Sequence, residues 1–192
     1  MEFVLILFAY LSGSIPTGYI VGWLVGVDVR KTGSGNIGAT NVTRVLGKKQ
    51  GLLTLIADIA KGFMPVFVAV QLHSSVTATA FVAVAAFLGH LYPIFLKFKG
   101  GKGVATALGA FLGVAPIASL ILIALFAAIV LSSRIVSLSS MIAAAAAPVV
   151  LWFFSYPLVL IGMSAFFAAM IIVRHRTNIK RLLAGTEPKL GS

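Results

Sequence analysis

The chain alternates between long apolar runs and short polar stretches. The apolar runs are Phe3–Val25, Leu52–Leu72, Val76–Leu96, Val104–Leu131, Ile135–Phe153 and Pro157–Val173. A helix of about 20 apolar residues is long enough to cross the hydrocarbon core of a bilayer. The pattern therefore predicts an all-α, polytopic transmembrane helical bundle, and we expect residues 1–192 to form a single transmembrane domain. The first run lacks a basic leader and a small-residue cleavage site, so we expect a retained helix.

The run Val104–Leu131 is too long for a single crossing. At about 1.5 Å per residue it would extend roughly 40 Å, whereas the hydrocarbon core is about 30 Å thick. Gly113 and Pro116 lie within this run, and proline cannot continue the hydrogen bonding of a helix. We therefore predict that the run divides here, which gives seven helices.

Basic residues support this division because they gather in alternate connections. With the division, all the loop and tail cations fall on one side, as the positive-inside rule requires. We expect the N-terminus outside, the C-terminus in the cytoplasm, and a multi-pass protein of the cell inner membrane. The cations concerned are Arg30, Lys31, Arg44, Lys48, Lys49, Lys97, Lys99, Lys102, Arg134, Arg174, Arg176, Lys180, Arg181 and Lys189.

Composition narrows the possible partners. The net charge is +11, from fifteen Lys and Arg against four Asp and Glu, and 60% of the residues are hydrophobic. In a membrane protein this charge indicates anionic lipid or anionic substrates, and we expect no nucleic acid, because stacking platforms and single-strand motifs are missing. The absence of cysteine excludes disulfides and a thiol nucleophile. Acidic residues and histidines are too scattered to predict a metal site, and no cofactor is expected.

Two glycine-rich stretches adjoin the predicted helices. The first is Lys31–Arg44, KTGSGNIGATNVTR, and the second is the GGKG loop, Gly100–Gly103. Glycine lets backbone N–H groups approach a ligand closely, and a helix N-terminus favours an anion. We expect a phosphate at Gly101–Gly103, beside Lys102. In the first stretch, the guanidinium of Arg44 suits bidentate phosphate contact. Small side chains that can donate hydrogen bonds lie near it in the sequence: Ser34, Asn36, Thr40 and Asn41. A plain juxtamembrane turn would explain either stretch alone.

Two charges lie inside the second run. Asp58 and Lys61 are three residues apart and therefore share a helix face. Each costs about 2.5–3.5 kcal/mol near the bilayer centre. They form either a structural ion pair or part of a binding site, and the neighbouring Gly62, which lets a backbone or ligand approach, favours the site.

Other polar residues allow two interpretations. His175 and Asn178 lie in the basic tail, and we favour a functional role for them. His90 is either a functional residue or an interfacial one. Ser137, Ser139 and Ser140 either cap the helix that they begin or contact a ligand. The GxSxG nucleophile motif and the HxxxxD acyltransferase motif are both missing from the sequence. A transporter or channel for a small phosphorylated anion is the alternative to an enzyme.

Five motifs together resemble one known family. SGSIPTGY, GSGNIGATNVTRVLGKKQG, DIAKG, GGKGVATALG and RHRTNIKRLLAGTEPK look like the bacterial acyl-phosphate-dependent glycerol-3-phosphate acyltransferases, in order and across essentially the whole chain. The resemblance implies a seven-helix enzyme of the inner membrane. It would transfer a fatty acyl group from acyl phosphate to the 1-hydroxyl of glycerol 3-phosphate, giving lysophosphatidate and phosphate.

The resemblance also implies an active site on the cytoplasmic face. The expected catalytic residues are Lys102, His175, Asn178, Ser34 and Arg44. The expected substrate and phosphate ligands are Gly33, Gly35, Asn36, Thr40, Asn41, Lys61, Gly100, Gly101, Gly103 and Ser140. The base that accepts the hydroxyl proton is either His175 or the phosphate of the donor, and the roles of Asp58, His90 and Glu187 stay open.

Overall fold

The structure, a computed structural model, describes residues 2–191, and every regular element within them is helical. The predicted all-α class is therefore confirmed. The elements in chain order are α1 (Glu2–Ser14), α2 (Thr17–Leu24), α3 (Ala39–Leu46), α4 (Lys48–Gln71), α5 (Val76–Leu91), the 3-10 helix η1 (Ile94–Leu96), α6 (Val104–Val114), α7 (Pro116–Ser133), α8 (Val136–Phe153), α9 (Leu158–Arg174) and α10 (Arg176–Leu183).

The chain separates into two compact units. The first is Met1–Val114, which carries α1 to α6, and the second is Ala115–Ser192, which carries α7 to α10. The single transmembrane domain stays a prediction.

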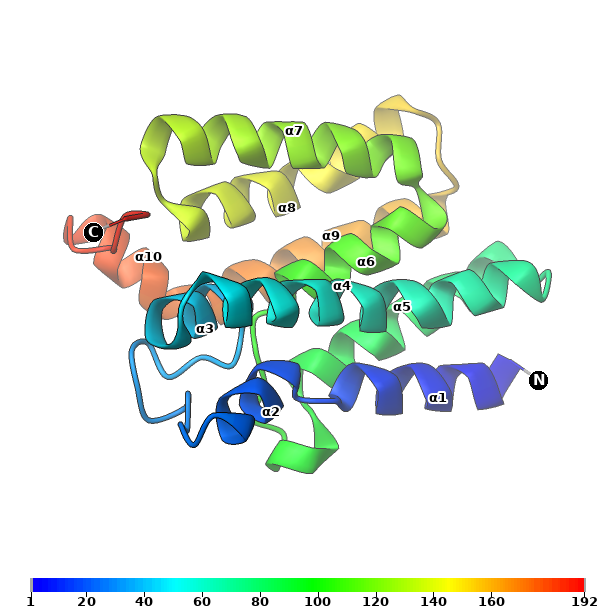
Figure 1. Cartoon of the computed structure of the whole chain (residues 1–192). Coiled ribbons are helices and arrows are strands. Elements are labelled where there is room, and N and C mark those ends of the chain that lie inside the picture. Colours follow the sequence, from blue (N-terminus) through cyan, green and yellow to red (C-terminus); the bar gives the residue numbers. More distant parts are fainter. Residues whose placement is uncertain (1, 192) are drawn as a thin grey trace. The chain divides into compact units, whose positions relative to one another are not determined.

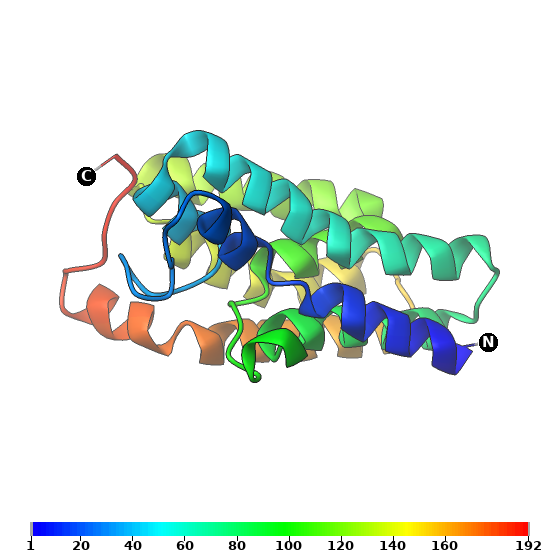
Figure 2. The same cartoon turned by 60° about the horizontal axis from the view of Figure 1, so that its bottom comes forward.

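In the first unit, α1 packs along α5 and α4 packs along α6 (Figures 1 and 2). Glycines allow this close approach. A Cβ atom at Gly13 would lie 2.0 Å from the carbonyl oxygen of Ala86, and one at Gly62 would lie 2.1 Å from that of Thr106. Membrane helices pack through such small residues because their backbones can then come into contact. Gly62 therefore allows the backbones of α4 and α6 to come into contact. The sequence left open whether a backbone or a ligand would approach this glycine, and the structure places a backbone there.

The sequence predicted one continuous helix for the first apolar run, whereas the structure has two. The helix breaks after Ser14 and resumes at Thr17, since Pro16 has no N–H to donate to the preceding turn. The resulting α2 packs against α3 and α4. A small core of Val29, Ile37 and Val42 packs against Tyr19 and Val21 of α2 and is almost completely buried. This core anchors the first glycine-rich stretch to the unit.

In the second unit, α7 packs on α8 and α8 packs on α9 (Figure 1). α10 follows α9 directly and is bent from it by 60°. His175 lies at this bend, between the two helices.

The division of the fourth apolar run is confirmed. α6 ends at Val114 and α7 begins at Pro116, where the missing N–H of proline is tolerated in the first helical turn. Within residues 2–191, five helical segments are long and apolar enough to cross a membrane, or six if α9 and α10 count as one. α6 has 11 residues, about 16 Å of helix. Seven crossings and the orientation of the termini therefore stay predictions.

Candidate active site

Asn41 organises the first glycine-rich stretch from within. Its side chain is buried, at 2% exposure. Nδ2 donates to the carbonyl oxygens of Val29 (3.0 Å), Thr32 (3.2 Å) and Asn36 (2.8 Å), and Oδ1 accepts from the backbone N–H of Ser34 at 2.8 Å. A phosphate would need the amide N–H groups, and these are directed at carbonyls. The geometry thus gives Asn41 a role in shaping the loop, and its phosphate contact stays a prediction.

The glycines of this stretch have conformational and steric roles. Gly33 and Gly35 have φ angles of +60° and +70°, a region that side chains disfavour. A Cβ atom at Gly33 would also lie 2.4 Å from Oδ1 of Asn41. The N–H of Gly38 donates to Oδ1 of Asn36 at 2.8 Å. These contacts close the loop on itself.

Three predicted site residues of the same stretch lie at the surface. Ser34, Thr40 and Arg44 are exposed. Thr40 and Arg44 are four residues apart on α3 and therefore share a face. Thr40 belongs to the first turn of α3, where backbone N–H groups favour an anion. This surface can present a hydroxyl, a helix N-terminus and a guanidinium to a phosphate.

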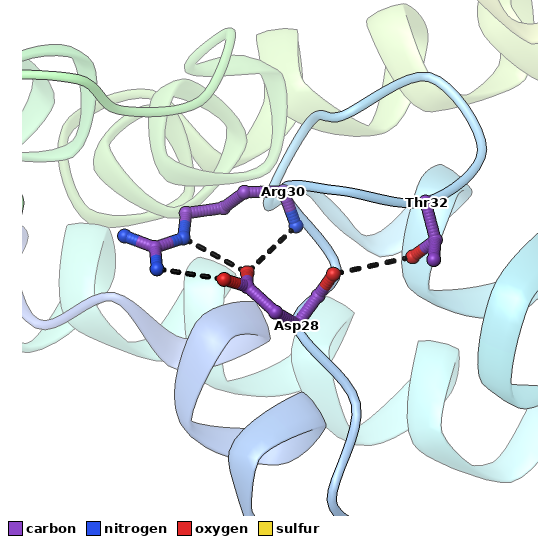
Figure 3. A network of polar contacts seen from close by, with 3 residues as sticks. All are labelled: Asp28, Arg30 and Thr32. Carbon is purple, nitrogen blue, oxygen red and sulfur yellow. Dashed lines mark hydrogen bonds and ion pairs between the residues drawn. The ribbon is translucent and has the colours of Figure 1, made fainter.

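An ion pair fixes the entry to the stretch (Figure 3). Asp28 accepts from the backbone N–H of Arg30 at 3.0 Å and from its Nε and Nη2 atoms at 2.9 and 2.8 Å, while Thr32 donates to the Asp28 carbonyl. The guanidinium lies 4.3 Å from the centre of the Tyr19 ring. The hydrogen bond from Arg30 lowers the pKa of Asp28 to about 2. Arg30 thus stabilises the loop from outside.

The charges inside α4 have protein partners. Nζ of Lys61 lies 2.8 Å from Oδ1 of Asp58 and donates to the carbonyl oxygen of Ile15 at 2.8 Å. Oδ1 of Asp58 also accepts from Oγ1 of Thr17 at 2.5 Å, and it lies 3.6 Å from Nδ1 of His90. The shared face of Asp58 and Lys61 is confirmed, and these contacts favour the ion pair over a direct substrate contact by Lys61.

The GGKG loop packs on the end of α5. The N–H of Gly100 donates to the carbonyl of Leu91 at 3.2 Å, and that of Gly101 donates to the carbonyl of His90 at 3.1 Å. These two N–H groups are therefore used within the protein, and phosphate binding by Gly100 and Gly101 stays a prediction. Gly103 has a φ of +87°, and a Cβ atom there would lie 2.3 Å from the Phe87 ring.

The other half of the loop retains the features of an anion site. The loop runs directly into α6, which begins at Val104. The first N–H groups of a helix have no partner within that helix. Lys102, which is partly buried, comes two residues before this N-terminus, and its ammonium adds the charge that a phosphate requires.

In the second unit, Glu187 joins three polar residues. Its carboxylate accepts from Oγ of Ser137 at 2.7 Å, from Nδ2 of Asn178 at 2.5 Å and from Nε of Arg181 at 2.6 Å. Partial burial raises the pKa of Glu187, but the three hydrogen bonds outweigh it and leave the pKa below its usual range. Glu187 therefore fixes the amide of Asn178. The sequence offered one signal for this role: an isolated acid within a basic tail.

The structure also orients His175 and the serines of α8. Nδ1 of His175 lies 2.8 Å from the carbonyl oxygen of Ile171. A carbonyl accepts only, so Nδ1 carries a proton, and when the ring is neutral Nε2 is its basic nitrogen. Ser139 and Ser140 donate to carbonyls one turn earlier, those of Ile135, which precedes α8, and Val136. Neither caps the helix, so the capping interpretation is wrong for both.

The chain is similar to known proteins over nearly its whole length. A family model described as glycerol-3-phosphate acyltransferase matches residues 3–185. Glycerol-3-phosphate acyltransferases of Geotalea daltonii and Geobacter sulfurreducens are 52% and 53% identical to the chain over 186 residues, covering 97% of it and 96% of each relative. That of Aquifex aeolicus is 47% identical over 184 residues, 95% of the chain and 96% of the relative.

Two crystal structures of PlsY, described as an integral membrane glycerol 3-phosphate acyltransferase, are also similar to the chain. Its glycerol 3-phosphate form has a TM-score of 0.96, with 46% identity over 99% of this chain and 96% of that one. Its lysophosphatidic acid form has a TM-score of 0.93, with 46% identity over 99% and 95%.

Proposed function

The chain belongs to the glycerol-3-phosphate acyltransferase family, and as an enzyme of that family we propose that it transfers a fatty acyl group from acyl phosphate to the 1-hydroxyl of glycerol 3-phosphate. The products are lysophosphatidate and phosphate, in the first step of phospholipid synthesis. The match of the family model over residues 3–185 carries this proposal. It identifies an enzyme, so the transporter alternative is not retained.

The geometry of the first unit supports a reaction between two phosphorylated substrates. Acyl phosphate and glycerol 3-phosphate each bring a phosphate, and the unit presents two helix N-termini with a nearby cation. One is the start of α3, where Thr40 shares a face with Arg44 of the last turn, and the other is the start of α6 with Lys102. Both arrangements suit an anion. The apolar helices and the surrounding lipid accept the acyl chain.

The chemistry requires no covalent intermediate on the enzyme. Acyl phosphate is a mixed anhydride with a good leaving group. The 1-hydroxyl oxygen attacks the acyl carbonyl carbon, a carbon–oxygen ester bond forms, and the bond from that carbon to the phosphate oxygen breaks. Lys102 stabilises the charge that grows on the departing phosphate. Ser34 and Arg44 orient the acceptor, since reaction between two bound molecules depends on their alignment.

The hydroxyl proton leaves to one of two acceptors. Nε2 of His175 is the basic nitrogen of the neutral ring, because Nδ1 is committed to the Ile171 carbonyl. The departing phosphate is the alternative. Asn178, held by Glu187, supplies an amide for a substrate oxygen. We place this site on the cytoplasmic face of the inner membrane, where the basic connections gather under the positive-inside rule.

The test uses the purified full-length protein in lipid nanodiscs. With palmitoyl phosphate and labelled glycerol 3-phosphate, we expect labelled lysophosphatidate and an equal amount of phosphate. Absence of labelled product with acyl phosphate, under conditions in which an enzyme of known activity from the family works, would overturn the proposal.

A further inference from the structure

Asp58 has more partners than charge balance requires. A carboxylate inside a membrane helix is costly unless it is paired, and Lys61 supplies that pair at 2.8 Å. The same oxygen also accepts a hydrogen bond from Thr17 and faces Nδ1 of His90. These further contacts come from α2 and α5, which lead to the two glycine-rich segments.

One set of contacts leads to the GGKG loop through His90. Nδ1 of this ring faces Asp58, while Nε2 is directed toward Gly101: a Cβ atom on that glycine would lie 2.2 Å from Nε2. The backbone carbonyl of His90 also accepts the N–H of Gly101 at 3.1 Å. His90, which is 4% exposed, therefore lies between the carboxylate and the loop and supports the segment that carries Lys102.

The other set of contacts leads to the first glycine-rich stretch through Thr17. Thr17 opens α2, and the following Gly18 packs so closely on this stretch that a Cβ atom would lie 1.9 Å from the carbonyl oxygen of Ile37. Lys61 adds a second restraint, since it donates to Ile15, two residues before Thr17. The Asp58–Lys61 pair thus fixes the position of the break between α1 and α2. The first glycine-rich stretch packs against α2 directly after this break.

We infer that Asp58 is a positioning residue that holds both glycine-rich segments of the first unit in place, one through His90 and the other through Thr17. Its kinetic consequence rests on the proposed function, because alignment of two phosphorylated substrates requires both segments to be ordered. A misplacement of about 1 Å can cost roughly a hundredfold in rate. The effect on loop order does not depend on which reaction the enzyme catalyses.

The test is backbone hydrogen exchange in residues 31–38 and 99–104 of the full chain in nanodiscs. Thr17→Val should raise exchange in the first stretch alone, His90→Leu in the GGKG loop alone, and Asp58→Asn in both. We expect increases of roughly five- to tenfold, the factor that accompanies loss of one polar contact of about 1 kcal/mol. Thr79→Val is the control: Thr79 is buried and donates to the carbonyl of Ser75, and its loss should leave both segments unchanged.

Kinetics provide the second measurement. Thr17→Val and His90→Leu should each lower kcat/KM about tenfold or more, without a matching fall in the thermal midpoint. Wild-type exchange in both segments of Asp58→Asn, or a uniform rise across all helices, would overturn the inference. If Asp58→Asn does not fold, Thr17→Val and His90→Leu decide. The inference is contradicted if each of these two variants raises exchange in both segments, or if neither variant raises exchange in either segment. An inactive wild type would instead refute the proposed function and leave the exchange result standing.

Discussion

The side-chain oxygen of Asn41 accepts a hydrogen bond from the backbone N–H of Ser34 at 2.8 Å. This contact joins the first turn of α3 to a predicted catalytic residue seven positions earlier. Because the nitrogen of the same amide donates to three carbonyls, one buried side chain sets the position of Ser34 and closes the loop around it.

Asn41→Asp tests this role. The carboxylate retains an acceptor for Ser34, but it places an oxygen opposite the carbonyls that Nδ2 now serves. Leaving buried polar groups unsatisfied costs about 1–3 kcal/mol, so the thermal midpoint should fall and KM for glycerol 3-phosphate should rise. The control is Gln71→Glu, the same amide-to-acid change at an exposed site at the end of α4. Equal behaviour of the two variants would contradict a loop-forming role for Asn41.

The apolar runs predicted most helix boundaries well, because hydropathy measures the transfer of each side chain into lipid. The predicted helix Ile135–Phe153 is α8, Val136–Phe153. The same measure could not place the break at Pro16 or the contact between Thr17 and Asp58, which are 41 positions apart. Such contacts depend on how distant parts of the chain pack together, which a local sequence pattern does not reveal.

The glycines of the candidate site show a second limit. The sequence predicted that Gly100 and Gly101 approach a phosphate, whereas the structure has them approach α5. Close approach to a helix and close approach to a phosphate both require a residue without a side chain. The glycines alone therefore could not show which of the two lies beside the loop. Lys102 and the N-terminus of α6 are the parts of that prediction that still suit an anion.

Membrane topology can be tested with single cysteines, since the chain has none of its own. If α6 and α7 are two separate crossings, Lys99→Cys and Ser132→Cys should react with an impermeant reagent from the same side, and Ser74→Cys from the other. α6 is short for a bilayer, so this pair is the decisive one. Labelling of residues 99 and 132 from opposite sides would end the seven-crossing prediction.

Acid should weaken the contacts of Glu187. Its pKa in the folded protein lies below the ordinary value of 4.5, so the unfolded chain takes up a proton first as the pH falls. The stabilisation is therefore present above about pH 4.5 and is lost as the pH falls through the folded pKa. Glu187→Gln should lower the thermal midpoint at pH 7 and flatten its fall between pH 5 and 3. The control Glu2→Gln, at an exposed acid, should keep the wild-type slope.

The donor preference follows from the leaving group. Acyl phosphate needs little acid catalysis to depart, and the sequence has no HxxxxD pair to assist a poorer leaving group. We expect kcat/KM with palmitoyl phosphate to exceed that with palmitoyl-CoA by at least a hundredfold, which corresponds to about 2.7 kcal/mol of transition-state stabilisation. Comparable turnover with both donors would refute the acyl phosphate assignment while leaving the family intact.

Lys102 is the cation on which the phosphate assignment depends most. It precedes the N-terminus of α6 by two residues, in a loop whose glycine backbone is fixed against His90 and Leu91. An ammonium held at that point meets a phosphate whose charge grows as the anhydride breaks. Removing a single donor of this kind costs about 3 kcal/mol or more, so Lys102→Ala should lower kcat/KM roughly a hundredfold.

Lys48→Ala is the matched comparison for Lys102→Ala. Lys48 is also basic and also lies at the start of a helix, since it is the first residue of α4, but it is exposed. A lysine that meets only lipid headgroups contributes through a screened surface charge, so Lys48→Ala should keep most of the activity. Both variants are compared at equal expression and equal thermal midpoint in the acyl-transfer assay. If their activities are similar, Lys102 does not contact the departing phosphate, and the anion site at the start of α6 must be abandoned.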